Sequence, residues 1–237
     1  LVTLNIGSVI SKLCDSSFYI REIWVYSSNA QFIDYGMKDL NTLNSTPVKD
    51  LLGRALRDLR ISVTDRCNFR CPYCMPAEIY GESYKFLSRD EILSFEEIAR
   101  LVKMFVRVGT KKIRLTGGEP LVRSGVETLI HMLSKLEGIE DITLTTNGYL
   151  LEEKALALKQ AGLQRITVSL DSLDDHIFGI MNGKGYQVER ILKGIDKALE
   201  VGLDPIKVNV VVQKGVNDHT LLDLLRHFKD SRVIVRF

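Results

Sequence analysis

Residues 58–76 read DLRISVTDRCNFRCPYCMP, and this stretch joins a strand pattern to a loop with three cysteines. Apolar and polar residues alternate from Leu59 to Val63, which is typical of a strand with one buried face. The loop that follows contains Cys67, Cys71 and Cys74 in the spacing CxxxCxxC. The stretch therefore predicts a strand that delivers three thiols to one edge of a sheet.

Three closely spaced thiols predict a metal centre. A four-iron cluster with three cysteine ligands keeps one iron open for another molecule, whereas clusters used only for electron transfer usually have four cysteines. A structural zinc site is the alternative, and it normally needs a fourth ligand. The remaining cysteine, Cys14, lies far upstream. The spacing favours an iron–sulfur cluster with one open iron.

The strand pattern recurs along the chain, and amphipathic helical stretches separate its copies. The first of these stretches, SFEEIARLVKMFVRVG (94–109), begins with a capping box of Ser94 and Glu97 and ends at Gly109. Six alternations of strand and helix predict a parallel sheet with right-handed crossovers. Further helices are expected after Arg123, Leu151, Gln187 and Asp218, and the strand-like runs are LRISVT (59–64), KKIRLT (111–116), DITLTT (141–146), RITVSL (165–170), IKVNVVV (206–212) and RVIVRF (232–237).

Each strand-like run has one apolar and one polar face. Parallel strands covered by helices on both faces should be apolar throughout, but in the fifth run Val208, Val210 and Val212 alternate with polar residues such as Lys207 and Asn209. A sheet curled around a polar cavity explains this pattern, because barrel strands alternate between interior and exterior. A two-layer sheet with its polar face in water is the alternative.

Chemistry-bearing residues follow four successive strand-like runs. In βα barrels, functional residues gather on the loops after the C-terminal strand ends. The cysteine loop follows the first run, residues 117–120 (GGEP) follow the second, Asn147 follows the third, and Ser169 and Asp171 close the fourth. The glycines would let backbone approach a ligand closely, and Glu119 could accept a hydrogen bond from an ammonium group. A tight turn is the alternative for GGEP alone.

The polar face also carries several cations, namely Arg60, Arg114, Lys207 and Arg236. Buried cations without partners are unfavourable, so these side chains require anions. Asp171 is a candidate partner within the chain. A triphosphate is a candidate ligand, since guanidinium groups match phosphate geometry.

The cysteine loop, with Tyr73 before its last cysteine, is similar to the signature of radical S-adenosylmethionine (SAM) enzymes. More narrowly, residues from about 50 to 237 resemble the GTP 3′,8-cyclase family. The resemblance implies an α/β fold, a partial (β/α)6 TIM-like barrel. Its blocks, in chain order, are DLRISVTDRCNFRCPYCMP, KKIRLTGGEPLVR, LTTNG, ITVSLDSLDD and KVNVVVQKGVND.

The resemblance also implies a reaction. It is the conversion of GTP to (8S)-3′,8-cyclo-7,8-dihydroguanosine 5′-triphosphate through a 5′-deoxyadenosyl radical, the first step of molybdenum cofactor biosynthesis. The cluster and SAM would carry the chemistry, and no catalytic side chain is implied. The alternatives are another radical SAM enzyme, such as a peptide-modifying one, and a non-catalytic zinc-binding module.

Site residues follow from the same resemblance. Cys67, Cys71 and Cys74 would hold a [4Fe-4S] cluster. The implied SAM contacts are Tyr73, Gly118, Glu119 and Ser169, and the implied GTP contacts are Arg60, Arg114, Thr145 and Lys207. The implied partners are GTP, an electron donor and the next enzyme of the pathway, cyclic pyranopterin monophosphate synthase; a homodimer is a further option.

Composition sets broad limits. The 237 residues are 45% hydrophobic and 26% charged, with a net charge of +2. These values fit an ordinary globular protein and give no argument for nucleic-acid or membrane binding. No apolar run is long enough to span a bilayer. Cluster ligation requires reduced thiols, so we expect a reducing compartment such as the cytoplasm.

The chain divides into two expected parts. Residues 1–49 show no periodicity and are expected to be an irregular leader, with Met37 as a candidate for the true start, whereas residues 50–237 form the barrel. A genuine N-terminal extension is the alternative. Members of the resembling family continue past this point with three more cysteines for a second [4Fe-4S] cluster that holds GTP. We therefore expect a fragment that is incomplete for turnover on its own.

Overall fold

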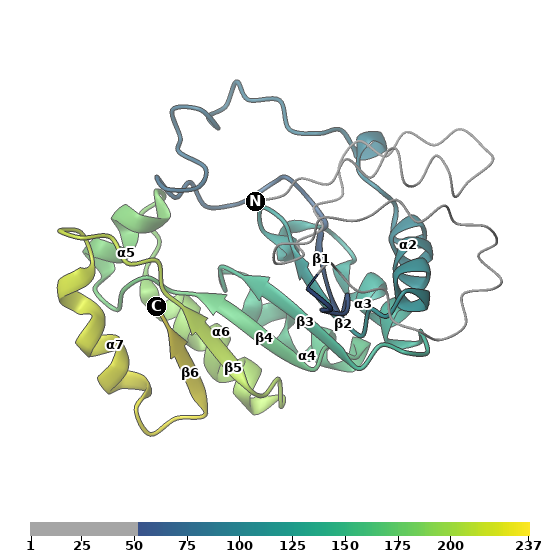
Figure 1. The fold of residues 1–237 in the computed structure, drawn as a ribbon. Coiled ribbons are helices and arrows are strands. Elements are labelled where there is room, and N and C mark those ends of the chain that lie inside the picture. Colours follow the sequence, from purple (N-terminus) through teal and green to yellow (C-terminus); the bar gives the residue numbers. More distant parts are fainter. Residues whose placement is uncertain (1–51) are drawn as a thin grey trace.

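The structure is a computed structural model that describes residues 52–237. The predicted leader, Met37 and Cys14 lie outside these described residues. The described chain forms one six-stranded sheet in the order β1-β2-β3-β4-β5-β6, and all neighbouring strands are parallel (Figure 1). The predicted α/β fold with six parallel strands is confirmed.

Helical segments separate the strands along the chain. The strands are β1 (Asp58–Ser62), β2 (Lys112–Thr116), β3 (Asp141–Thr146), β4 (Arg165–Ser169), β5 (Ile206–Asn209) and β6 (Val233–Arg236). The α-helices are α2 (Phe95–Arg107), α3 (Val126–Ser134), α4 (Leu151–Ala161), α5 (Asp175–Asn182), α6 (Val188–Glu200) and α7 (Leu221–Phe228). The short 3-10 helices are η2 (Arg89–Glu91), η3 (Pro120–Val122) and η4 (Asp218–Thr220). No helix of this described part is long and apolar enough to cross a membrane.

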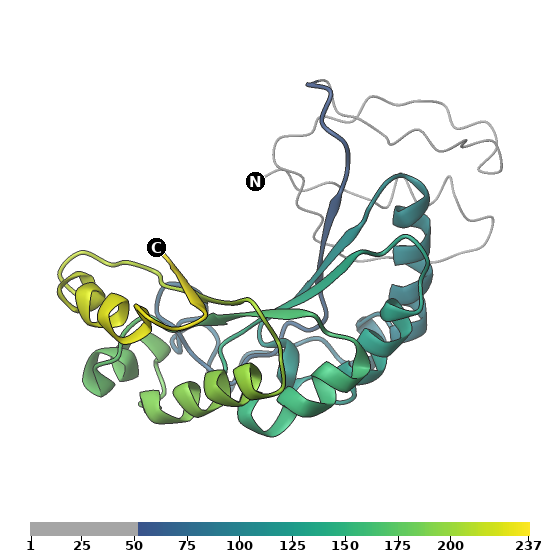
Figure 2. The same ribbon diagram turned by 90° about the horizontal axis from the view of Figure 1, so that it is seen from below.

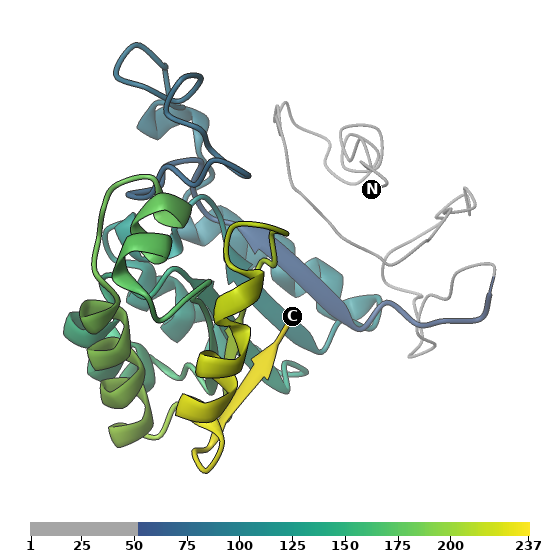
Figure 3. The same cartoon turned by 90° about the vertical axis from the view of Figure 1, so that its left-hand side faces the viewer.

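The two faces of the sheet differ as the alternation predicts. Register pairs Leu59 with Ile113 on one face and Arg60 with Arg114 on the other. Figure 2 shows α2, α3, α4 and α6 along the convex side of the strongly curved sheet, with the opposite side concave. The apolar face packs against these helices (Figure 3), and its central residues Leu144 and Val168 are fully buried. The polar face therefore lines the concave side.

The end of β5 departs from the prediction. The strand ends at Asn209, and Val212 is 42% exposed although it was expected on the apolar face. The backbone N–H of Val210 still donates to Arg236 O at 2.9 Å, but the N–H of Val211 donates to the side chain of Asp171 at 2.8 Å. The chain thus leaves the sheet when a buried carboxylate replaces the neighbouring strand as acceptor.

The helix prediction was right for α2 and incomplete for α5. Ser94 Oγ accepts from the N–H of Glu97 at 3.1 Å, and Glu97 Oε2 accepts from the N–H of Ser94 at 2.7 Å, which is the predicted capping box. Helix α5 was not predicted. Its sequence signals are Asp174, which caps its first turn, and Gly183, which follows its last residue in a left-handed conformation.

The end of α5 supports the cysteine loop. The N–H of Arg70 donates to Asn182 O at 2.9 Å. A Cβ atom on Gly183 would lie 2.0 Å from Arg70 O, so only glycine allows this approach. Gly185 has a similar φ of +67°, but a Cβ there would have no neighbour within 4 Å.

These two glycines give a matched test of the contact. Both alanine substitutions place a side chain at positive φ, which costs about 1–2 kcal/mol. Gly183→Ala must also displace the cysteine loop, so we expect it to lower the free energy of unfolding by about 3 kcal/mol or more. Gly185→Ala should have only the backbone effect. Urea unfolding of the two variants measures the free energies of unfolding. Equal losses in the two variants would contradict the prediction, because they would mean that the loop at Arg70 moves aside at little cost.

Candidate functional site

The cysteine loop leaves the C-terminal end of β1 and lies at the rim of the sheet. Cys67 and Cys71 are half-buried and Cys74 is exposed. Burial raises the pKa of the Cys67 thiol to about 11 and that of the Cys71 thiol to about 12. Thiolates form at these positions only if a cation compensates them, as a bound metal does.

The donor set fits a cluster better than a single ion. All three thiols come from one loop, and the described residues contain no further cysteine. A structural zinc site normally has four protein ligands, whereas three cysteines suffice for a four-iron cluster with one open iron.

Two residues inside the cysteine motif hold the loop in place, and sequence reasoning did not single them out. Phe69 is 3% exposed and packs edge-on against Tyr149 and Phe178. The guanidinium of Arg70 donates to the carbonyls of Cys67, Phe69 and Tyr80 at 2.7–2.8 Å. The Phe69 side chain thus anchors the loop in the core, and the Arg70 side chain satisfies backbone carbonyl groups of the loop.

The GGEP glycines allow a close approach within the chain itself. A Cβ on Gly117 would lie 2.6 Å from Thr64 O, and one on Gly118 would lie 2.4 Å from Arg66 O. The N–H of Gly118 donates to Thr64 O at 2.7 Å, and that of Glu119 donates to Arg66 O at 2.8 Å. The close approach that these glycines permit is therefore to the backbone that leads into the cysteine loop.

Glu119 connects two neighbouring loops through its buried carboxylate. The side chain is 1% exposed; its Oε1 accepts from Thr146 Oγ1 at 2.7 Å and from the N–H of Leu121 at 2.9 Å. Its Oε2 accepts from the N–H of Asn147 at 2.6 Å. Burial raises the pKa of Glu119 to about 7, although these hydrogen bonds oppose the shift. The carboxylate thus fixes the loops after β2 and β3 against each other.

Asn147 links this carboxylate to the cysteines. Its side-chain Nδ2 donates to Asn68 Oδ1 at 2.8 Å and lies 3.9 Å from Cys67 Sγ. The N–H of Phe69 donates to the same sulfur at 3.4 Å. Hydrogen bonds to cysteine sulfur tune iron–sulfur centres, so these donors match a cluster ligand at Cys67.

Tyr73 and Asp171 tie the cysteine loop to the far side of the rim. Tyr73 donates its hydroxyl to Asp171 Oδ2 at 2.7 Å, and Asp171 Oδ1 accepts from the N–H of Val211. Asp171 is 5% exposed, and burial raises its pKa. The prediction that Asp171 could pair with the cations is not supported, since its two carboxylate oxygens accept from Tyr73 and Val211 and no ion pair of Asp171 is found among residues 52–237.

Ser169 lies beside Asn209, a candidate contact residue that sequence reasoning did not single out. Register places Ser169 of β4 next to Asn209 of β5 and Arg236 of β6 on the concave face. The amide oxygen of Asn209 is buried and has no hydrogen-bond partner in the described chain. A buried acceptor without a donor is unfavourable, and the ammonium or hydroxyl groups of a ligand such as SAM would satisfy it.

The predicted GTP contacts occupy two neighbouring rows of the concave face. Arg60 and Arg114 share one row. Thr145 and Lys207 belong to the next, each paired with Thr167. Arg114 Nη1 donates to Thr145 Oγ1 at 3.3 Å, which joins the rows. Burial and the other cations on this face lower the pKa values of Arg114 and Lys207, because positive charges repel one another there.

The comparisons with known proteins agree with this arrangement. The model of the radical SAM superfamily matches residues 61–228, and the chain belongs to this superfamily. Curated relatives from Staphylococcus aureus strains JH9 and N315, both called GTP 3′,8-cyclase, are 52% identical over 190 residues. These matches cover 80% of this chain and 56% of each relative, so the chain spans just over half the length of the relatives it matches.

Solved structures share the fold at low sequence identity. Streptococcus suis SuiB has a TM-score of 0.60 and 21% identity, and the match covers 75% of this chain and 38% of SuiB. Methylornithine synthase (PylB) has a TM-score of 0.58 and 16% identity, with 78% of this chain and 54% of that chain covered. These similarities support the fold alone.

The pKa of Glu119 generates a test of the rim. A carboxyl pKa that is raised from 4.5 to about 7 on folding contributes stability that is present below pH 4.5 and is lost as the pH rises through 7. We expect this contribution to change by about 3 kcal/mol between those limits. Glu119→Gln should remove it. Denaturant unfolding of parent and variant across this pH range checks the prediction, and parallel stability curves would contradict it.

Proposed function

We propose that this chain is the SAM-cleaving barrel of a GTP 3′,8-cyclase, with a [4Fe-4S] cluster and SAM as cofactors. The observation that carries the proposal is the pairing of three rim thiols with a cation-rich concave surface on the same sheet. The 52% identity to relatives with this name supports the assignment.

Cys67, Cys71 and Cys74 would hold the cluster, and SAM would lie beside it on the concave face. Tyr73, Ser169 and the GGEP loop are the proposed SAM contacts. Gly118 and Glu119 would act mainly by fixing the position of that loop, because Glu119 already accepts three hydrogen bonds. When bound, the cluster and SAM supply the radical chemistry.

Arg60, Arg114, Thr145 and Lys207 would bind GTP. Burial and then repulsion lower the pKa values of Arg114 and Lys207, and the anionic triphosphate would relieve the repulsion. The curved sheet would hold the substrate on the same side as the thiols and limit its contact with water. The product would be (8S)-3′,8-cyclo-7,8-dihydroguanosine 5′-triphosphate.

The remaining assignments concern the whole protein. The curated relatives are longer than this chain, and only about half of each is matched. We propose that a second [4Fe-4S] cluster belongs to the full-length protein, that an electron donor serves the first cluster, and that the product passes to cyclic pyranopterin monophosphate synthase. A reducing compartment such as the cytoplasm and a homodimer belong to the same proposal.

The cluster assignment has a direct test. Cys71→Ala should abolish iron binding and SAM cleavage while the circular dichroism spectrum stays unchanged, because the thiol contributes a ligand rather than a fold element. Cys14→Ala is the control, since Cys14 stands outside the motif. Iron content, electron paramagnetic resonance after anaerobic reconstitution, and 5′-deoxyadenosine formation measure the result. A Cys71→Ala variant that still cleaved SAM would refute the assignment.

The substrate assignment needs a variant that spares the cofactor. Arg114→Ala should weaken GTP binding about tenfold or more, because a charge-assisted hydrogen bond contributes about 1.5–3 kcal/mol. SAM cleavage without substrate should continue. Arg226→Ala is the matched control, since Arg226 is an exposed arginine of α7 that pairs with Asp223 on the same helix. Unchanged GTP affinity in Arg114→Ala would remove this residue from the substrate site.

A further inference from the structure

One row of the concave face contains arginines on both sides of a short side chain. Register aligns Arg60 of β1, Arg114 of β2, Thr143 of β3 and Arg165 of β4. Thr143 has a short side chain, and it lines a pocket together with these three arginines. Adjacent strands lie about 4.8 Å apart, so β2 and β4 are separated by about 9.6 Å. This is the separation of the two backbones, and an anion above β3 is within reach of a long side chain from either strand.

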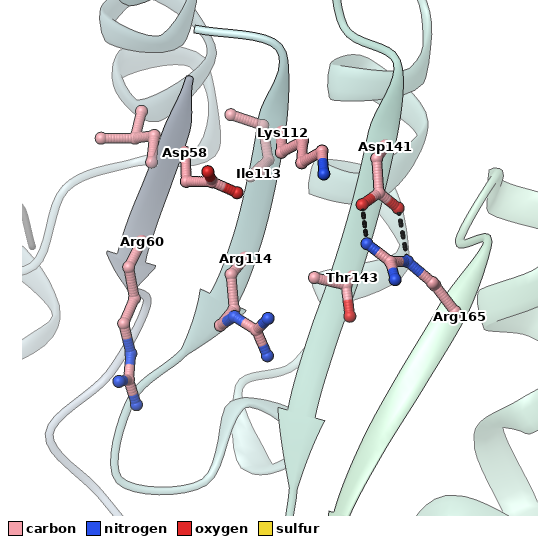
Figure 4. A pocket seen from close by; sticks show the side chains of 9 residues that line it. Asp58, Arg60, Lys112, Ile113, Arg114, Asp141, Thr143 and Arg165 are labelled. Atoms are coloured by element: carbon pink, nitrogen blue, oxygen red, sulfur yellow. Dashed lines mark hydrogen bonds and ion pairs between the residues drawn. The ribbon is translucent and has the colours of Figure 1, made fainter. Parts of the chain in front are cut away.

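A pocket of about 250 Å³ lies over this row. Figure 4 shows the side chains of Arg114 and Arg165 on either side of Thr143. The side chains around the pocket comprise four cations and two carboxylates, which leaves two positive charges in excess. The charged residues are Arg60, Lys112, Arg114, Arg165, Asp58 and Asp141.

Asp141 holds Arg165 in one orientation. Arg165 Nε donates to Asp141 Oδ1 at 2.9 Å, and Nη2 donates to Asp141 Oδ2 (Figure 4). The pair occupies one edge of the guanidinium plane, and Nη1 does not take part in it. The ion pair raises the pKa of Arg165, so this side chain keeps its charge. A guanidinium that is already oriented loses less conformational freedom when it binds an anion.

The charges in the row leave Arg114 poorly compensated. After burial, the causes that lower its pKa are Arg60, Arg165 and Arg236 in that order, and the carboxylate of Asp58 opposes them more weakly. Arg114 donates a hydrogen bond to the hydroxyl group of Thr145, which is neutral. An anion between Arg114 and Arg165 would therefore gain from both guanidinium groups and reduce their repulsion.

We propose that Arg114 and Arg165 form a phosphate clamp across Thr143, with Asp141 as the positioning residue for Arg165. The clamp takes the terminal phosphates of a nucleoside triphosphate. Its nucleotide specificity rests on the proposed function, whereas the clamp itself requires only a polyphosphate anion. Arg165, Asp141 and Thr143 thereby become determinants of the preference for triphosphates over monophosphates.

The test measures binding of inorganic triphosphate, GTP and GMP to the 237-residue chain by calorimetry. Arg165→Gln should weaken binding of triphosphate and GTP about tenfold or more, while GMP affinity stays within about twofold because GMP lacks terminal phosphates. Arg165→Lys keeps the charge but loses the paired donors of the guanidinium group, so its affinity for triphosphate should lie between those of the parent and Arg165→Gln. Thr143→Ile keeps every charge but places a larger side chain in the pocket, so it should weaken triphosphate binding as well.

The control is Lys154→Gln. It breaks a half-buried ion pair with Glu127 between α3 and α4, away from the concave face, and it should leave all three affinities unchanged. Thermal unfolding shows which variants keep the fold. Undiminished triphosphate binding in folded Arg165→Gln or Thr143→Ile overturns the clamp, and so does a parent that does not bind triphosphate. A parent that binds triphosphate with the expected losses but does not prefer GTP supports the clamp and refutes the GTP assignment.

Discussion

The two-residue alternation of the parallel strands is the constraint on which the rest of this structure depends. Because register pairs apolar with apolar and polar with polar residues, every helix that packs on the sheet must cover the same face. The other face then collects Arg60, Arg114, Ser169 and Lys207 on one concave surface. A one-residue slip in any strand would bury these side chains and expose the core, so the hydrophobic effect that stabilises the fold also assembles the candidate site.

Buried carboxylates fix the rim above this surface. Glu119 joins the loops after β2 and β3, and Asp171 joins the cysteine loop to the chain after β5. Both groups have raised pKa values because burial disfavours their charge. Such desolvated acceptors are unfavourable unless they are satisfied, and they therefore hold their donors in defined places. The three thiols sit on a loop that is anchored by these contacts, by Arg70 and by Phe69.

Much of the fold and part of the site could be predicted before the structure. Period-two alternation, the Ser94–Glu97 capping box and the strand-end positions of the cysteine and GGEP loops are local properties of the chain. The features that were missed or misjudged include α5, the end of β5, the partners of Asp171 and the Asp141–Arg165 pair. Helix α5 had local signals that were overlooked, whereas each of the other three depends on a contact between segments far apart in sequence. The carboxylate that ends β5 is forty residues upstream of Val211, and no pattern within β5 announces it.

The sequence by itself determined the chemistry that this protein can offer: three thiols in one loop, cations on alternate positions, and strands that must be parallel. These follow from residue type and spacing, which act over a few neighbours. Only the tertiary structure decided which of these groups meet. The glycines of GGEP allow a close approach of the backbone that leads into the cysteine loop, and the buried carboxylate of Glu119 connects two loops. Thr143 lies between two arginines on the neighbouring strands. The physical reason is that register and curvature of the sheet, set by the packing of the whole core, decide distances between side chains on different strands.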